Sequence, residues 1–252
     1  MGRFVCGIVV SLSAISIAQA QSANGVTPKS SLSKGEKAAM RAGFVKMAGD
    51  SRYLVVPYGA YKIGSMWNSS KIRVCWSDPG VPSLTIRNVV RAAVADSWSQ
   101  YVNVTFIGWE DCADTFAPDI SLHVAKTMSV TTKLGKNLRD VDPGMLLRID
   151  YSSVPECKAK EAANPNYCLR ANTIHEFGHA LGLVHENLRP DAPNWCKEYD
   201  LKEDKDRNLP DGMIGVADKY SIMNHCNPSS LNNGYLSVGD IDTIKKLYGA
   251  MK

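Results

Sequence analysis

The run T-I-H-E-F-G-H-A-L-G-L-V-H-E at residues 173–186 constrains the fold of this chain more than any other stretch. His175 and His179 are four residues apart, so on an α-helix both imidazoles project from one face and can reach a single ion. The residues between and after them are mostly apolar, which is typical of a helix buried under a sheet. We therefore predict a buried helix that presents a metal site to a cleft.

Gly182 interrupts the apolar pattern after the second histidine. A glycine there can adopt the left-handed conformation that ends a helix, so the chain can turn back and bring His185 to the same ion. Three protein ligands leave one coordination position open, as in catalytic zinc sites, whereas structural zinc usually has four ligands and commonly several cysteines. The spacing predicts one zinc ion held by His175, His179 and His185.

Glu176 follows the first ligand and would lie beside a metal-bound water without having to coordinate the metal. Zinc lowers the pKa of such a water to about 7, so a carboxylate can take its proton near neutral pH and pass it to a leaving amine. The predicted reaction is peptide-bond hydrolysis, with Glu176 as general base and then general acid. The alternative is a zinc-binding protein of the same fold that acts as a binding or adhesion module without catalysis. The presence of Glu176 argues against that alternative.

The extended pattern H-E-x-x-H-x-x-G-x-x-H and the sequence S-I-M-N at residues 221–224 resemble the two signatures of the metzincin zinc peptidases. The resemblance implies that Met223 lies beneath the metal as a hydrophobic base and is not a ligand. Glu186, after the third histidine, is similar to the astacin type, and another metzincin subfamily would leave the mechanism unchanged. The resemblance covers roughly residues 67–249. It implies an α+β fold in which a mixed, twisted, five-stranded sheet packs on long helices, with an active-site helix and a C-terminal helix.

One position departs from the astacin pattern. Astacins have a tyrosine two residues after the turn methionine, which can coordinate zinc and then move to stabilise the tetrahedral intermediate, whereas this chain has His225 there. A histidine can bind the metal or donate a hydrogen bond, so the role can persist in altered form. The alternative is that His225 is an ordinary buried residue. The sequence leaves both interpretations open.

Residues 1–20 have the pattern of a secretory signal peptide, with one positive charge at Arg3, a short apolar stretch and an A-x-A ending at Ala20. We expect cleavage before Gln21 and a secreted product, either extracellular or periplasmic.

The net charge of +4 is too small to favour binding to nucleic acid, and no apolar run is long enough to span a bilayer. The expected partners are protein or peptide substrates of a monomeric enzyme, with no stable membrane insertion.

Residues 21–61 differ in composition from the rest of the mature chain, and we interpret them as the propeptide of a zymogen whose catalytic domain is 62–252. They begin with a stretch rich in Ser, Asn, Thr and Pro. One helix is expected from Ser33 to about Met47, with Ser33 as its cap and Glu36 three residues later.

Latent astacins block the zinc with an aspartate in an F-x-G-D segment, and M-A-G-D at residues 47–50 is similar. Asp50 is therefore a candidate latency switch, because a carboxylate on the open zinc position would silence the enzyme. The alternative is an ordinary Gly-Asp turn after the helix. If the switch is real, activation should cut the chain between Asp50 and Trp67.

Six cysteines remain after the signal peptide, an even number that indicates three disulfides in an oxidising compartment. A cysteine metal site is disfavoured because the sequence has no C-x-x-C pair. Six cysteines allow fifteen connectivities, of which we expect the pairing of nearest neighbours, Cys75 with Cys112, Cys157 with Cys168, and Cys196 with Cys226. The last pair would connect the segment after the third histidine with the methionine turn.

The remaining pattern predicts a sheet and two further helices. Strands are expected at 71–76, 102–107, 120–124 and 145–149, with 128–134 as the cleft edge strand that the resemblance implies. A long helix should begin at a Ser83 cap and bury the face formed by Ile86, Val89, Val90, Ala93, Val94, Ser97, Trp98 and Tyr101. The last helix, at 236–248, should carry a capping box of Ser237 and Asp240.

Two other features receive a structural interpretation. His123 lies in the strand at 120–124, and we expect it to be structural. The acidic pattern of Asp204, Asp206 and Asn208 is similar to a calcium loop but lacks the glycine and the terminal glutamate of that motif, which favours an ordinary acidic turn.

Overall fold

A mixed five-stranded sheet forms the centre of the fold in the computed structural model, which describes residues 59–113, 117–197, 210–229 and 231–250 and the backbone of two short upstream strands. The spatial order is β5-β4-β6-β8-β7. The parallel strands are β4 (Lys71–Trp76), β5 (Thr105–Asp111), β6 (Ile120–Ala125) and β8 (Met145–Arg148), and the short edge strand β7 (Val130–Thr131) is antiparallel to β8. The expected mixed five-stranded sheet is confirmed.

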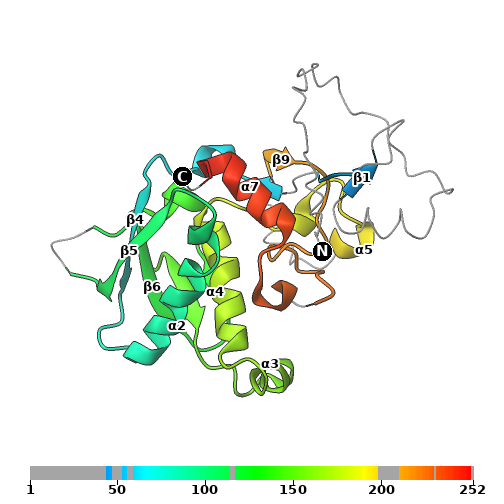
Figure 1. Ribbon diagram of the computed structural model, residues 1–252. Coiled ribbons are helices and arrows are strands. Elements are labelled where there is room, and N and C mark those ends of the chain that lie inside the picture. Colours follow the sequence, from blue (N-terminus) through cyan, green and yellow to red (C-terminus); the bar gives the residue numbers. More distant parts are fainter. Residues whose placement is uncertain are drawn as a thin grey trace, which may run out of the picture.

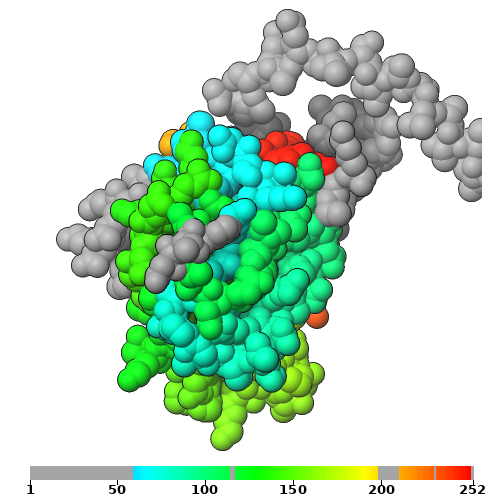
Figure 2. Space-filling view, turned by 90° about the vertical axis from the view of Figure 1, so that its left-hand side faces the viewer, coloured from blue at the N-terminus to red at the C-terminus, as the bar shows by residue number. Residues whose placement is uncertain are grey.

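Two helices cover one face of this sheet. In β4 alternate residues Ile72, Val74 and Trp76 are buried, so only one face of the strand turns to the core. The helices α2 (Leu84–Ala95) and α4 (Tyr167–Ala180) lie side by side against it (Figure 1). Figure 2 looks onto the side of the molecule where β4 and β5 lie, with the yellow-green residues of α3 (Pro155–Glu161) at its lower end.

The apolar face predicted for the first long helix is confirmed. Val90, Ala93 and Val94 are buried on α2, and the ring of Trp98, in the following 3-10 turn η2 (Trp98–Gln100), is buried behind it. The indole Nε1 of Trp98 donates a hydrogen bond of 2.8 Å to the carbonyl oxygen of Ile174 on α4. This contact fixes the position of the helix that carries the histidines.

The remaining elements are short, apart from the last helix. The structure has η1 (Ile63–Ser65), η3 (Gly135–Leu138), η4 (Glu186–Leu188), α5 (Asn194–Lys197), β9 (Gly212–Ile214), η5 (Leu231–Gly234) and α7 (Val238–Tyr248). In α7 the predicted capping box of Ser237 and Asp240 is present, with both reciprocal hydrogen bonds. The C-terminal helix is therefore confirmed.

Strand β3 (Gly59–Tyr61) packs into this body and pairs antiparallel with β9. Its residues lie at the end of the range that the sequence analysis assigned to a propeptide. Arg189 holds this region together: its Nη1 donates to the carbonyl oxygens of Gly59 at 2.8 Å and Ile214 at 3.2 Å, and its Nη2 donates to that of Gly215 at 2.7 Å. The guanidinium is 1% exposed, so these bonds replace its hydration.

The three disulfides join Cys75 with Cys112, Cys157 with Cys168, and Cys196 with Cys226, which confirms the nearest-neighbour pairing. The third disulfide connects the segment after the histidine motif with the residues that follow the methionine turn.

Several element boundaries differ from the prediction. The strand expected at 102–107 is β5 and begins at Thr105, while Val102 forms an isolated bridge with Ala250. A bulge with positive φ at Gly108 and Trp109 lets β5 continue to Asp111. The edge strand expected at 128–134 has only the two residues of β7, and the helix that carries the histidines begins at Tyr167.

One helix prediction is confirmed only in part, a second is wrong, and three further predictions concern residues that the structure does not describe. Ser83 occupies the N-cap position of α2, but its side chain makes no capping hydrogen bond. The helix expected from Ser33 to Met47 is wrong where it can be checked, because residues 44–46 form strand β1 (Phe44–Lys46), which pairs with β2 (Tyr53–Val55). The signal peptide, Asp50 and the acidic pattern at 204–208 lie outside the described residues.

Within the described part of the chain, no helix is long and apolar enough to cross a membrane.

Candidate metal centre

Helix α4 carries the first two histidines of the motif, and a backbone carbonyl oxygen holds the Nδ1 atom of each ring. The Nδ1 atom of His175 lies 2.8 Å from the carbonyl oxygen of Ile222, and Nδ1 of His179 lies 2.9 Å from that of Leu183. A carbonyl oxygen only accepts, so in both rings Nδ1 carries the proton and Nε2 presents its lone pair. This backing is typical of histidines that bind a metal through Nε2.

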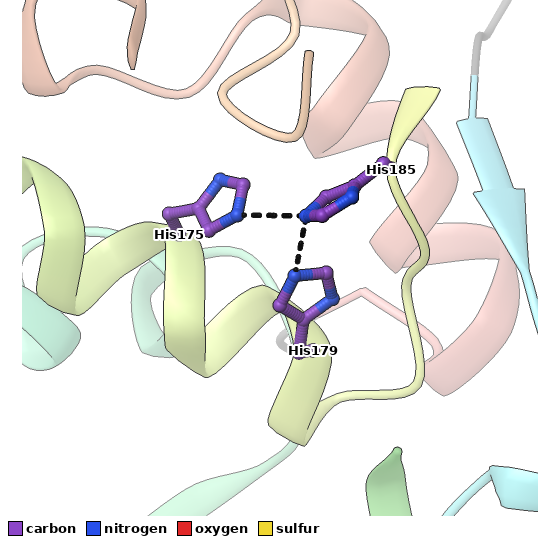
Figure 3. A group of neighbouring side chains, drawn as sticks. All are labelled: His175, His179 and His185. Atoms are coloured by element: carbon purple, nitrogen blue, oxygen red, sulfur yellow. Dashed lines mark hydrogen bonds between the residues drawn. The ribbon is translucent and has the colours of Figure 1, made fainter. Parts of the chain in front are cut away.

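Gly182 ends the helix in the conformation that the sequence predicts. Its φ is +87°, in the left-handed region where a side chain is strained. A Cβ at this position would also lie 2.3 Å from the terminal methyl carbon of Met66 and 2.8 Å from the hydroxyl oxygen of Ser65, so these side chains would have to move. The chain leaves α4 here and runs back toward the histidine face with His185 (Figure 3).

Strand β3 fixes the segment that carries the third histidine. The amide of Lys62 donates to the carbonyl oxygen of Gly182 and the amide of Val184 donates to that of Ala60, each at 3.0 Å. These bonds bracket the residues directly before His185. The position of the third imidazole therefore depends on a strand more than a hundred residues earlier in the sequence.

The three imidazoles converge on one point (Figure 3). Nε2 of His185 lies 3.2 Å from Nε2 of His175 and 3.0 Å from Nε2 of His179, and one ligand atom from each ring lies within 4.8 Å of the others. Two nitrogens bound to one tetrahedral zinc at roughly 2.1 Å would be about 3.4 Å apart. The three-histidine group therefore fits a single zinc ion.

The electrostatic environment favours the metal-binding form of the first histidine. Burial lowers the pKa of His175 well below its usual value, and the neighbouring His179, His185 and His225 act in the same direction. His175, His179 and His185 are 5%, 7% and 6% exposed, respectively. A ring that is neutral near pH 7 can bind a cation without first losing a proton.

Glu176 is also buried, and its side chain contacts the edge strand. It is 5% exposed, and its Oε2 accepts a hydrogen bond of 2.7 Å from the hydroxyl of Thr131 on β7. The sequence predicts Glu176 from the motif, but nothing in it indicates the partner. Thr131 is brought to the carboxylate only by the pairing of β7 with β8.

Met223 lies under the helix turn that carries the ligands. It is 2% exposed, and a Cβ added at Gly178 would lie 2.3 Å from its sulfur. Its carbonyl oxygen accepts a hydrogen bond of 2.9 Å from the amide of Glu186, directly after the third histidine. The methionine turn therefore packs against the helix and also contacts the segment of His185.

Asp240, at the start of α7, holds the methionine turn in place. Its Oδ1 accepts a 2.6 Å hydrogen bond from the hydroxyl of Ser221, and its Oδ2 accepts from the amide of Ile222 at 2.9 Å. The carbonyl oxygen of Ile222 accepts from Nδ1 of His175, so the last helix is connected to the first ligand through one residue. Sequence analysis assigned Asp240 only a capping role.

Glu186 belongs to a buried carboxylate group below the centre. It is 1% exposed, and burial raises its pKa to about 8 although Arg189 lies 3.4 Å away and opposes the shift. Burial also raises the pKa of Asp218, whose backbone amide donates to Glu186 at 3.0 Å. Burial first and Asp218 second raise the pKa of Asp240 to about 6.

His225 lies beside the imidazole group but is not part of the converging set. Its ring centroid is 3.8 Å from that of His185 and 5.4 Å from that of His175. The residue is exposed, so the interpretation of His225 as an ordinary buried residue is wrong. A role of His225 in binding or catalysis stays a prediction.

His123 lies away from this group and is held by two carboxylates. Its Nε2 is 2.6 Å from Oδ1 of Asp142, and its Nδ1 is 3.5 Å from Oδ1 of Asp78. These contacts connect the end of β6 with two loops. The structural interpretation of His123 agrees with this arrangement.

Two cavities adjoin β7 and the residues directly before it. The first, of about 300 Å³, is lined by residues 127–129 before the strand and by Tyr151 and Asn172, and Asn172 is one helical turn before Glu176. The second, of about 590 Å³, is lined by residues 130–134 together with Lys62 and Asp211. The three histidines and Glu176 line neither cavity, but Thr131, which contacts Glu176, lines the second.

No protein family model and no curated protein matches this chain. Among solved structures, the chain is similar to myroilysin, with a TM-score of 0.54 and 24% identity over 75% of this chain and 98% of that one. It is also similar to high choriolytic enzyme 1, a hatching enzyme zinc-protease from the medaka fish Oryzias latipes, with a TM-score of 0.50 and 17% identity over 76% of this chain and all of that one (100%). These similarities confirm the metzincin-like fold expected from the sequence.

Proposed function

We propose that this chain is a secreted, astacin-like zinc endopeptidase that is made as a zymogen. The observation that carries the proposal is the convergence of three imidazoles, His175, His179 and His185, with Glu176 on the helix that carries the first two. The Nδ1 atoms of His175 and His179 are held by backbone carbonyl oxygens. Three nitrogen ligands with a neighbouring carboxylate are the composition of a catalytic zinc site. The zinc-protease description of the medaka structure, which shares the fold, agrees with this chemistry.

The protein groups have separate roles in the proposed hydrolysis. When bound, zinc would lower the pKa of a water molecule and polarise the scissile carbonyl. Glu176 accepts the proton of the attacking water and delivers it to the leaving amine. His225, whose ring contacts that of His185, donates a hydrogen bond to the developing oxyanion. Met223 gives the ligand-bearing helix a rigid apolar base.

The shape of the cleft indicates the substrate class. Strand β7 is the edge of the sheet in the described residues, and two cavities are lined by this strand and the residues directly before and after it. An extended peptide can add to such an edge by main-chain hydrogen bonds and place side chains in the cavities. We therefore infer protein or peptide substrates bound in extended form, with no role for nucleic acid.

Secretion and latency are part of the same proposal. Three disulfides agree with an oxidising compartment such as the extracellular space or the periplasm. Because β3 supports the segment of His185, an activating cut that keeps the site intact should lie before Gly59. We therefore place the cut between Asp50 and Gly59, a narrower window than the one expected from the sequence, and keep Asp50 as the candidate switch.

The competing function is that of a zinc-binding protein without catalysis. The buried, hydrogen-bonded carboxylate of Glu176 favours the enzyme, because a binding module has no need for a base beside the first ligand. The test is to incubate the zinc-loaded protein with an unfolded protein and identify fragments by mass spectrometry, with and without a chelator. New fragments that disappear with the chelator and return with zinc are expected. An intact substrate under every condition, also after removal of residues before Gly59, would favour the binding protein.

A further inference from the structure

We propose that Thr131 is a positioning residue that holds the carboxylate of Glu176 in one orientation and connects it to the edge strand β7. The inference rests on the proposed peptidase function, because it concerns the general base of that reaction. Neither the motif nor the resemblance assigns a role to Thr131.

The contact between the two side chains is short and charged. Oγ1 of Thr131 lies 2.7 Å from Oε2 of Glu176 and 3.0 Å from the carbonyl oxygen of the same residue. A threonine hydroxyl has one proton, and the carboxylate oxygen is both nearer and charged, so it is the stronger acceptor. The hydrogen bond therefore goes to the side chain of Glu176, while the backbone oxygen lies close by.

The orientation of the carboxylate depends on such a partner. The last torsion of a glutamate side chain is broad, so a carboxylate without a fixed donor can rotate with little cost. Glu176 is buried with 5% exposure, where a hydrogen bond is stronger than in water. A hydrogen bond to Oε2 fixes the plane of the Glu176 carboxylate. Proton transfer from the attacking water requires a short distance and a defined orientation between the two groups.

Thr131 is itself held firmly by the sheet. Its backbone lies opposite Met145 of β8 in the antiparallel pair, and Val130 lies opposite Leu146. The amide of the next residue, Thr132, donates to the carbonyl oxygen of Gly144 at 3.0 Å. The hydroxyl of Thr131 is thus presented from a strand whose position is set on one side by β8.

The side of β7 that faces away from β8 links the Thr131–Glu176 hydrogen bond to substrate binding. Within the described sheet, β7 has β8 as its neighbour on one side and no strand on the other. A peptide that pairs with this open side would contact the same two-residue strand that orients Glu176. Substrate binding and alignment of the general base are therefore coupled through Thr131.

The kinetic test compares Thr131→Val, which keeps the shape and removes the hydroxyl, with Thr131→Ser, which restores it. For the zinc-loaded protein and a peptide substrate, we expect Thr131→Val to lower kcat about 10- to 100-fold and to change KM less than about 3-fold. Thr131→Ser should recover kcat to within about 3-fold of the parent. Thr105→Val, in an exposed position of β5, is the matched control and should behave like the parent. Equal loss in the valine and serine variants, or no loss in either, would overturn the proposal.

A second measurement does not depend on zinc or on activity. Urea unfolding of the zinc-free protein is compared for Thr131→Val, Glu176→Ala and the double variant. We expect Thr131→Val to shift the unfolding midpoint in the parent background and to shift it less than about half as much when Glu176 is absent. Equal shifts in both backgrounds would show that Thr131 does not act on Glu176. If the parent hydrolyses no peptide, the proposed function fails, and this cycle still decides whether the contact holds the carboxylate.

Discussion

Met223 and Gly178 are in such close contact that any side chain at residue 178 would overlap the methionine: a Cβ there would lie 2.3 Å from the sulfur and 3.1 Å from the terminal methyl carbon. Gly178 is directly before His179 on α4. The methionine turn therefore packs against the helix where the metal ligands are carried, and glycine is required there by the packing.

We predict that Gly178→Ala destabilises the protein by about 1–3 kcal/mol, because overpacking of a tight core outweighs the gain of about 1 kcal/mol that alanine brings to a helix. Gly64→Ala is the matched control, because a Cβ at Gly64 would have no atom within 4 Å. The free energy of unfolding from urea titration is the measurement. Equal stability of the two alanine variants would contradict the packing of Met223 described here.

The stability of the protein should depend on pH through Asp240. Burial and the nearby Asp218 raise its pKa to about 6 from an ordinary value of 3.8. The folded state therefore binds this proton more tightly than the unfolded state. Its contribution to stability is complete below about pH 4 and is lost as the pH rises through about 6, with a total on the order of 2–3 kcal/mol.

This dependence is measured on zinc-free protein by urea unfolding between pH 4 and pH 7. The difference in unfolding free energy between the parent and Asp240→Asn should decrease as the pH rises. Asp242→Asn, on the same helix with a partly exposed side chain, is the control and should keep the parent's dependence. A parent-minus-variant difference that stays constant or grows with pH would show that the sign is wrong.

Much of this site can be predicted from sequence, because several of its features depend only on residues that are close together in the chain. The helical spacing of His175 and His179, the positive φ of Gly182 and the capping box at Asp240 each depend on a few consecutive residues. The even set of cysteines after the signal peptide indicated three disulfides, and their pairing follows the order of the chain.

The remaining contacts depend on strand register and packing between distant segments. The bond of Thr131 to Glu176 needs the pairing of β7 with β8, and the bonds of Arg189 need β3 and β9 to meet. No local pattern specifies which side chains such pairings bring together. The same reason explains why sequence analysis left His225 with two interpretations.

We predict that His225→Phe lowers kcat at least about 10-fold with little change in KM, because the phenylalanine ring keeps the ring contact with His185 but cannot donate a hydrogen bond. The zinc content should stay that of the parent. An unchanged kcat would mean that His225 only packs against the ligand. A loss of zinc together with activity would instead make it a metal ligand or a support for one.

The account as a whole is tested most directly by measuring zinc content and peptide hydrolysis together in the parent, Glu176→Gln and His179→Ala. We expect one zinc per chain and hydrolysis in the parent, and one zinc with hydrolysis reduced at least about 100-fold in Glu176→Gln. His179→Ala should lose both the metal and the activity, because it removes one of three ligands. Hydrolysis by Glu176→Gln at the parental rate would contradict the assignment of Glu176 as the general base. Full zinc content in His179→Ala would contradict the three-histidine centre.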